Sequence, residues 1–142
     1  MKHFLVMNGP NLNMTGIREK GVYGAKTLED INADIAALAE QLGVEVEFYQ
    51  SNHEGALIDR LHAAHGQLDG IILNAGAYTH YSYAIRDAIA AIDVPVVEVH
   101  ISNVHAREEF RKISVIAPVC KGTVAGFGPK GYAMALRALA EG

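Results

Sequence analysis

Apolar residues follow two different patterns along this chain, and the two patterns alternate from one end to the other. Short continuous or alternating apolar segments are typical of buried strands, and apolar stripes with a three- to four-residue spacing are typical of helices. The first pattern predicts strands at residues 4–8, 44–50, 70–74, 94–100 and 122–127. The second predicts helices that start at Thr27, that span residues 54–65 and 83–92, and that run from Pro129 to near Ala140.

The helix that starts at Thr27 carries clear signals at both of its ends. Asp30 follows Thr27 by three residues, which is a shorter version of a capping box, and Gly43 suits the position just after a helix. The stripes expected to face the sheet are Leu28, Ile31, Ile35, Leu38 and Leu42 in this helix, Leu57, Ile58 and Leu61 in the second, and Ala84, Ile85, Ala88, Ile89 and Ile92 in the third.

Strands that alternate with helices predict a parallel sheet that is covered on both faces. We therefore expect an α/β fold, a flavodoxin-like doubly wound five-stranded parallel sheet, in a single domain of residues 1–142. Residues 102–112 are polar and predict a loop with a short helix. In such folds, ligands bind at the carboxyl ends of the strands, beside the point where the strand order reverses.

Composition argues against several classes of protein. Lys and Arg number 12 and Asp and Glu number 16, so the net charge is −4, which argues against nucleic acid because that partner needs a clustered basic face. No apolar run approaches the roughly 18 residues of a membrane span, and residues 1–4 lack the pattern of a secretory signal. The single cysteine, Cys120, cannot form an intrachain disulfide, so we expect a cytoplasmic protein with an idle or buried thiol.

Polar and titratable residues follow three of the predicted strands. They are Asn8, Asn11, Asn74, His80, Glu98, His100 and Ser102. Taken alone, each has an ordinary structural explanation: Asn11 and Asn74 could close turns, His80 could cap the next helix, and His100 could be a hydrogen-bonded core residue. Three distant segments that agree on one edge of the sheet favour a common site, because the structural explanations need a separate coincidence for each residue.

The loop after the first strand is longer than a compact α/β domain needs, since such turns usually take about 2–6 residues. It carries Asn11, Asn13, Arg18 and Tyr23, and its four glycines allow it to hinge. Long loops in compact folds are typically lids or binding loops. We therefore expect residues 16–25 to form a catalytic lid over the strand ends.

Other kinds of site fit the sequence less well. The G-x-G-x-x-G motif of dinucleotide sites and the Gly-Lys-Ser/Thr ending of phosphate loops are absent, and Asn8 stands where a phospho-receiver domain needs an acidic residue. Glu98, His100 and His105 suggest a metal site, but they do not form a closed ligand set. Glu98 and His100 share one face of their strand, which predicts that Glu98 orients His100. We expect no metal and no cofactor.

Several of these segments together resemble type II 3-dehydroquinate dehydratase, also called type II dehydroquinase. The resemblance covers essentially the whole chain and rests on NGPNLN at 8–13, Arg18 with VYG at 22–24, QSNHEG at 50–55, ILNAGAYTHYS at 72–82, Asp87 and EVHISNVHAREEFR at 98–111. It implies a flavodoxin-like subunit that assembles into a homododecamer, a tetramer of trimers. It also implies the reversible dehydration of 3-dehydroquinate to 3-dehydroshikimate, without a metal or a covalent imine.

The resemblance also implies roles for individual residues. Tyr23 matches the general base, and Arg18 matches the arginine that promotes the phenolate form of that tyrosine. Asn11 matches the residue near the enolate oxygen, where it acts through an ordered water, and His100 matches the general acid. Substrate-binding positions fall on Asn74, His80, Asp87 and Arg111, and on the carboxylate-binding pair Ile101 and Ser102.

Two positions near the tyrosine depart from the family's usual pattern. Lys20-Gly21 stands where a proline is usual, and Thr15 stands where a leucine is common. Both differences predict a looser lid with unchanged chemical groups. Two other functions remain open: a hydro-lyase that acts on a related cyclic hydroxy acid, and a catalytically silent carboxylate-binding or assembly module. Aromatic biosynthesis and quinate breakdown both include the implied reaction, so either pathway fits.

Overall fold

The computed structural model describes residues 1–17 and 26–142. Within them, the chain forms a five-stranded sheet in the order β2-β1-β3-β4-β5, and every neighbouring pair of strands is parallel. The strands are β1 (His3–Asn8), β2 (Glu45–Gln50), β3 (Gly70–Asn74), β4 (Val96–His100) and β5 (Gly122–Ala125). The expected flavodoxin-like doubly wound sheet is confirmed.

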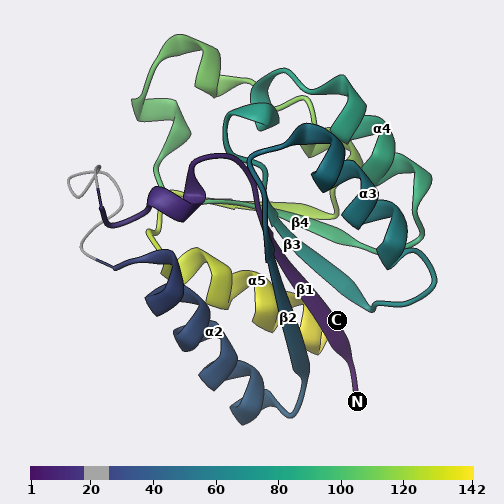
Figure 1. The fold of residues 1–142 in the computed structure, drawn as a ribbon. Coiled ribbons are helices and arrows are strands. Elements are labelled where there is room, and N and C mark those ends of the chain that lie inside the picture. The colour runs from purple at the N-terminus through teal and green to yellow at the C-terminus, as the bar shows by residue number, and fades with distance from the viewer. Residues whose placement is uncertain (18–25) are drawn as a thin grey trace.

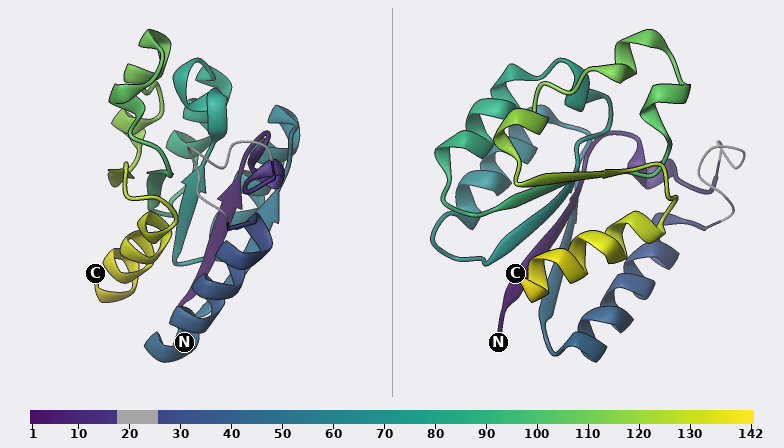
Figure 2. Two further views of the ribbon diagram at one scale, coloured as in Figure 1. Left: turned by 90° about the vertical axis from the view of Figure 1, so that its left-hand side faces the viewer. Right: turned by 180° about the vertical axis from the view of Figure 1, so that it is seen from behind.

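Helices cover both faces of this sheet (Figure 1, Figure 2). On one face lie α2 (Leu28–Leu42) and α5 (Lys130–Glu141), and on the other lie α3 (Glu54–Ala64) and α4 (Tyr83–Ala91). The chain passes from β1 through α2 to β2 at one edge, and then returns to the other side of β1 as β3. The carboxyl ends of β1 and β3 therefore flank the point where the strand order reverses.

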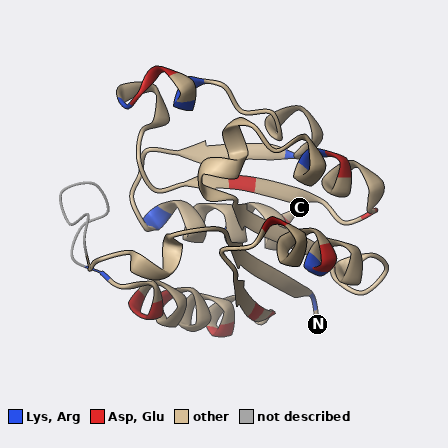
Figure 3. Cartoon of the chain, turned by 45° about the horizontal axis from the view of Figure 1, so that its top comes forward, with Lys and Arg blue, Asp and Glu red and all other residues tan. Residues whose placement is uncertain are grey.

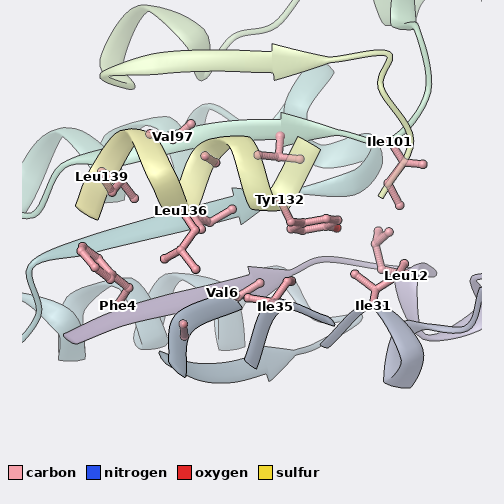
Figure 4. Packing of buried hydrophobic residues seen from close by; sticks show 14 residues of the cluster. Phe4, Val6, Leu12, Ile31, Ile35, Val97, Ile101, Tyr132, Leu136 and Leu139 are labelled. Atoms are coloured by element: carbon pink, nitrogen blue, oxygen red, sulfur yellow. The ribbon is translucent and has the colours of Figure 1, made fainter. Parts of the chain in front are cut away.

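Two apolar clusters form the core, one on each side of the sheet. Successive residues of a strand point to opposite faces, so Phe4 and Val6 of β1 join the cluster with α2 and α5, whereas Leu5 and Met7 join the one with α3 and α4. Figure 4 shows the first cluster, in which side chains from both helices meet those of the sheet. Full burial of one such side chain contributes about 1.5–3 kcal/mol to the stability of the fold, so both layers hold the strand ends in place.

The signals at the two ends of α2 act as the sequence predicts. Thr27 Oγ1 accepts a hydrogen bond from the backbone N–H of Asp30 (3.2 Å), and the backbone N–H of Thr27 donates to Asp30 Oδ2 (3.1 Å). Together the two bonds complete a capping box. Gly43 follows the helix with a φ of 69°, in the left-handed region that favours glycine. Among the predicted helix stripes, Ala84 is wrong, because it is exposed on α4, and Leu28 is half-buried but belongs to neither apolar cluster.

Two strand boundaries and one helix cap differ from the sequence pattern for identifiable reasons. β4 begins at Val96 rather than at residue 94, since Pro95 has no N–H to donate to a sheet. β5 ends at Ala125 rather than at residue 127, because Gly126 leaves the strand with a φ of 94°. Ser82, rather than His80, caps α4: its Oγ accepts the backbone N–H of Ile85 at 3.0 Å.

Short 3-10 turns shape the loops at the carboxyl end of the sheet. Two follow β1 and β3, namely η1 (Leu12–Met14) and η2 (Gly76–His80). The segment between β4 and β5 contains η3 (Val104–Ala106), η4 (Glu109–Lys112) and η5 (Ala117–Val119), so the short helix expected within residues 102–112 is present as two short 3-10 helices. In the two described ranges, no helix is both long enough and apolar enough to cross a membrane.

Candidate active site

A cavity of about 280 Å³ lies at the carboxyl ends of β1, β3 and β4. Its first wall is formed by the loops after β1 and β3, residues 9–14 and 75–77. Its second wall belongs to residues 101–111, in the segment between β4 and β5, and this stretch extends beyond the end of the sheet in Figure 1. Ligand pockets in proteins usually measure about 300–1,000 Å³, so a cavity of this size suits a molecule with a single ring.

The first wall is built from backbone groups that approach one another closely. The N–H of Gly9 donates to the carbonyl oxygen of Asn74 at 2.7 Å. A Cβ added to Gly9 would stand 2.6 Å from the carbonyl oxygen of Ala75, and one added to Gly76 would stand 3.0 Å from that of Pro10. Both loops therefore depend on glycine, because any larger residue would push the strand ends apart.

Asn11 lies at the rim of this wall with a φ of 70°, a left-handed conformation that asparagine tolerates better than most residues. Its backbone N–H donates to Asn52 Oδ1 at 3.0 Å. Gln50 Nε2 donates to the same Oδ1 and to the carbonyl oxygen of Gly9, each at 3.1 Å. Gln50 at the end of β2 and Asn52 just after it thus fix the loop after β1, and Asn11 is left to line the cavity.

Asn74 is buried at the floor of the cavity in a hydrogen-bonded chain. Its Nδ2 donates to the hydroxyl oxygen of Tyr132 at 3.1 Å, and that hydroxyl donates to Asn8 Oδ1 at 2.5 Å. Asn74 Oδ1 accepts the backbone N–H of Gly76 at 3.1 Å. Figure 4 shows Tyr132 reaching the sheet from α5. The amide of Asn74 is therefore held in one orientation, because both its oxygen and its nitrogen have partners.

His100 ends β4 and is buried beside Glu98. Its Nε2 is hydrogen-bonded to Glu98 Oε2, and the carboxylate is only 1 % exposed. Glu98 Oε1 accepts hydrogen bonds from Ser114 Oγ at 3.0 Å and from Thr123 Oγ1 at 3.5 Å. Glu98 thus contacts His100, and its role in orienting the ring stays a prediction. In the part of the chain that the structure describes, the second ring nitrogen, Nδ1, has no hydrogen-bond partner.

His80 lies beside His100, with the ring centroids 6.2 Å apart and the rings stacked at 21°. Its Nδ1 donates to the carbonyl oxygen of Ile113 at 2.8 Å, so in the neutral ring Nε2 is an acceptor. Burial lowers the pKa of His80, and the neighbouring charges of His100 and Arg111 lower it further. His80 is therefore a neutral hydrogen-bonding group at neutral pH.

The second wall offers groups that attract an anion. Arg107 and Arg111 both line the cavity, and Figure 3 shows acidic and basic positions side by side along this segment. Glu108 Oε1 accepts from Arg111 Nε at 2.9 Å, and this bond lowers the pKa of Glu108. Arg107 Nη1 donates to Ser102 Oγ at 3.3 Å. No hydrogen bond among the described residues uses the backbone N–H of Ile101 or Ser102.

The described residues of this site do not form a cluster of metal ligands. Among residues 1–17 and 26–142, no group of three or more His, Cys, Asp or Glu side chains is arranged to hold a metal ion. The side chains of Glu98 and His100 are hydrogen-bonded to each other. The prediction that the reaction needs no metal stays a prediction.

Comparison with known proteins identifies the family. The family model for class II dehydroquinases matches residues 2–140. The chain belongs to this family. It is 61 % identical to a 3-dehydroquinate dehydratase of Caldicellulosiruptor bescii over 99 % of this chain and 98 % of that protein. A 3-dehydroquinate dehydratase of Bacillus pumilus is 60 % identical over 98 % of this chain and 95 % of its own.

Solved structures of class II dehydroquinases share the fold closely. The type II dehydroquinase of Butyrivibrio crossotus superposes with a TM-score of 0.95 at 54 % identity, over 97 % of each chain. That of Propionibacterium acnes gives a TM-score of 0.97 at 42 % identity, over 100 % of this chain and 98 % of its own. The family expected from the sequence motifs is thereby confirmed, and this chain is an enzyme of the class II dehydroquinase family.

Among the described residues, those that a class II dehydroquinase is expected to use lie in three different places. Those that line the cavity are Asn11, Asn74, His80, His100, Ile101, Ser102 and Arg111. Glu98 lies behind His100 and lines a neighbouring cavity of about 240 Å³. Asp87 is exposed on α4 and lines neither cavity. Arg18, Tyr23 and most of the predicted lid at 16–25 lie outside the described residues.

Three residues of the site were missed by sequence reasoning. Arg107 lines the cavity four residues before Arg111, and its charge within the strand-end motif was the available signal. Tyr132 reaches the floor from α5. A tyrosine within an apolar helix stripe could have indicated this, because a buried hydroxyl needs a partner. Ser114 contacts Glu98, and no sequence signal pointed to it.

Proposed function

We propose that this protein is a metal-free hydro-lyase that converts 3-dehydroquinate reversibly to 3-dehydroshikimate. The observation that carries the proposal is the buried pair of His100 and Glu98 at a cavity whose second wall offers unused backbone N–H groups and two arginines. Membership of the class II dehydroquinase family, with relatives that are 3-dehydroquinate dehydratases, supports this substrate.

The first step is removal of the proton beside the ketone, and we assign it to Tyr23. A tyrosine can act as the base only as phenolate, and with an ordinary pKa of about 10 roughly one molecule in 10³ is ionised at pH 7. Arg18 is the group we expect to favour the phenolate, since a guanidinium close to the oxygen stabilises the negative charge. Both residues belong to the predicted lid, so closure of the lid would assemble the base.

The second step is loss of hydroxide from the adjacent carbon, and we assign the proton that it needs to His100. Loss of the proton beside the ketone leaves an enolate, whose oxygen Asn11 supports through an ordered water. Because Glu98 binds Nε2 of His100, the proton for the departing hydroxyl comes from Nδ1, the ring nitrogen without a partner among the described residues. The negative charge of Glu98 supports the protonated ring before transfer.

Binding of the substrate is divided between its carboxylate and its hydroxyl groups. We assign the carboxylate to the backbone N–H groups of Ile101 and Ser102, to the hydroxyl of Ser102, and to Arg111. Asn74 and His80 present fixed amide and imidazole groups suited to the substrate's hydroxyls. Asp87 keeps its proposed substrate-binding role, although in the single chain it lies apart from the cavity.

An ultraviolet assay for the enone of 3-dehydroshikimate tests the reaction directly. Absorbance should rise when the protein meets 3-dehydroquinate, and the rate should be the same with and without EDTA. A folded protein that gives no rise would favour the catalytically silent carboxylate-binding module. Loss of the rise with EDTA would favour a metal-dependent reaction instead. Turnover of a different cyclic hydroxy acid in preference to 3-dehydroquinate would favour the related hydro-lyase.

Substitution of Tyr23 by phenylalanine tests the assignment of the base. Tyr23→Phe should lower kcat by at least about 10³-fold, because it removes the group that accepts the proton, and ligand binding should remain. Tyr83→Phe is a matched control, since Tyr83 is 67 % exposed at the start of α4. Turnover near the parent rate in Tyr23→Phe would remove this residue from the base role.

We also propose an assembly and a location for the enzyme. The assembly is a homododecamer, a tetramer of trimers, as family membership suggests. The location is the cytoplasm, which the single cysteine supports, and the pathway is aromatic biosynthesis or quinate breakdown. Light scattering coupled to size exclusion measures the mass of the particle, and a value for one or three chains would contradict the dodecamer.

A further inference from the structure

Ser114 follows the second wall in the chain and lines the neighbouring cavity of about 240 Å³ together with Glu98 and His100. It takes part in two hydrogen bonds at once. Its Oγ accepts the backbone N–H of Ala117 at 3.0 Å, and it donates to Glu98 Oε1 at 3.0 Å. A backbone N–H can only donate, so it occupies a lone pair of the hydroxyl oxygen. The single proton of the hydroxyl is then directed to the carboxylate.

Glu98 therefore receives a hydrogen bond on each of its two oxygens. Oε1 accepts from Ser114, with Thr123 more distant at 3.5 Å, and Oε2 accepts from Nε2 of His100. A carboxylate that accepts on both oxygens has no proton of its own to give. In the neutral His100 ring, the proton is therefore on Nε2, and Nδ1 carries no proton.

We propose that Ser114 is a positioning residue for His100, because its hydroxyl fixes the Glu98 carboxylate that selects the Nε2–H tautomer of the ring. The effect on catalysis rests on the proposed function, whereas the tautomer of His100 does not. With Nε2 held by Glu98, a second proton enters and leaves at Nδ1. Ser114 thereby determines which ring nitrogen exchanges a proton with a ligand.

The residues on either side of Ser114 show that this short segment is firmly attached to the site. The carbonyl oxygen of Ile113 accepts from Nδ1 of His80 at 2.8 Å. The backbone N–H of Val115 donates to the carbonyl oxygen of Thr79 at 2.9 Å, and the Val115 carbonyl oxygen accepts from Arg86 Nη1 at 3.2 Å. Residues 113–115 therefore set opposite tautomers in the two stacked histidines, Nδ1–H in one and Nε2–H in the other.

Removal of the Ser114 hydroxyl should release the carboxylate. In Ser114→Ala, Thr123 Oγ1 at 3.5 Å is the one partner that Glu98 Oε1 keeps among the described residues. The carboxylate can then rotate, and the preference of His100 for one tautomer weakens. Ser114→Thr restores a hydroxyl at the same position. Thr123→Val is the matched control, because it removes the longer of the two hydrogen bonds to the same oxygen.

The direct test is magic-angle-spinning NMR of protein with ¹⁵N-labelled histidine at about pH 8, where an unperturbed histidine is neutral. The His100 signals are assigned by their loss in His100→Gln. The parent, Thr123→Val and Ser114→Thr should show the Nε2–H tautomer, and Ser114→Ala should show a mixture. Nδ1–H in the parent, or an unchanged single tautomer in Ser114→Ala, would overturn the inference. The parent spectrum decides the question even if Ser114→Ala does not fold.

Kinetics provides the second measurement. Ser114→Ala should lower kcat roughly tenfold, the usual effect of losing a hydrogen bond to a charged group, while KM changes less than about twofold because the substrate contacts remain. Ser114→Thr should recover most of kcat. A change in KM alone would overturn the inference. A parent that lacks dehydratase activity would refute the proposed function, and the NMR result would still decide the role of Ser114.

Discussion

The two walls of the cavity are built in different ways. In the first wall, loops meet through backbone atoms, and Gly9 lies so close to Ala75 that no side chain fits between them. In the second wall and the residues that follow it, several connections are made by side chains: Arg107 binds Ser102, Ser114 binds Glu98, and Arg86 binds the carbonyl oxygen of Val115. A wall closed by backbone contacts tolerates no added atom, whereas a wall held by side chains tolerates substitutions that keep the hydrogen bond.

The largest effect should follow from Gly9→Ala. The new Cβ would stand 2.6 Å from a backbone oxygen, and backbone cannot move aside as a flexible side chain can. We expect a loss of at least about 3 kcal/mol in the free energy of unfolding. Urea denaturation at matched protein concentrations measures it.

Gly55→Ala is the control for this substitution. Gly55 lies in the first turn of α3, and nothing lies within 4 Å of its added Cβ. Alanine should leave the free energy of unfolding unchanged or increase it by up to about 1 kcal/mol. Equal stability of the Gly9 and Gly55 variants would show that the first wall can yield, and the contrast between the walls would then be wrong.

A smaller effect should appear in the labelling rate of the Cys120 thiol. Cys120 follows η5 in the segment that leads from the second wall to β5. Burial, together with the negative charge of Glu98, raises the pKa of its thiol to about 12. Only the thiolate reacts with disulfide reagents, so the native protein should be labelled at least about 10²-fold more slowly than the urea-unfolded chain at the same pH. Comparable rates would mean that the second wall opens freely.

The smallest effect should be the pH dependence linked to His80. Burial lowers the pKa of His80 in the folded protein, helped by His100 and Arg111 and opposed by Glu98 and the Ile113 carbonyl. Below pH 6.5 the unfolded chain therefore binds a proton that the folded protein resists, so stability falls as the pH drops through 6.5 towards the lowered pKa.

His80→Asn removes this titrating group and tests the linkage. Stability should depend less on pH in the variant than in the parent between about pH 7.5 and pH 5.5, as measured by urea denaturation. Parallel curves for the two proteins would contradict a neutral His80 in the folded site.

Hydrophobic patterning predicts the fold of this chain well. The sequence motifs predict some parts of the cavity better than others. The strands and α2 follow from buried apolar runs and from local signals such as Thr27 and Asp30, which depend on neighbours in sequence. The strand-end motifs also predict the cavity residues Asn74 and His100, because parallel strands end at one edge. Ser114 depends on a partner 16 residues away, and no local pattern reports such a contact.

The hydroxyl of Tyr132 joins the two ends of the chain at the floor of the cavity, since its partner Asn8 is 124 residues away in sequence. During synthesis on the ribosome, the first strand emerges long before the last helix. The cavity floor therefore cannot be completed until α5 has been translated, and a nascent chain that stalls before α5 should have no working site.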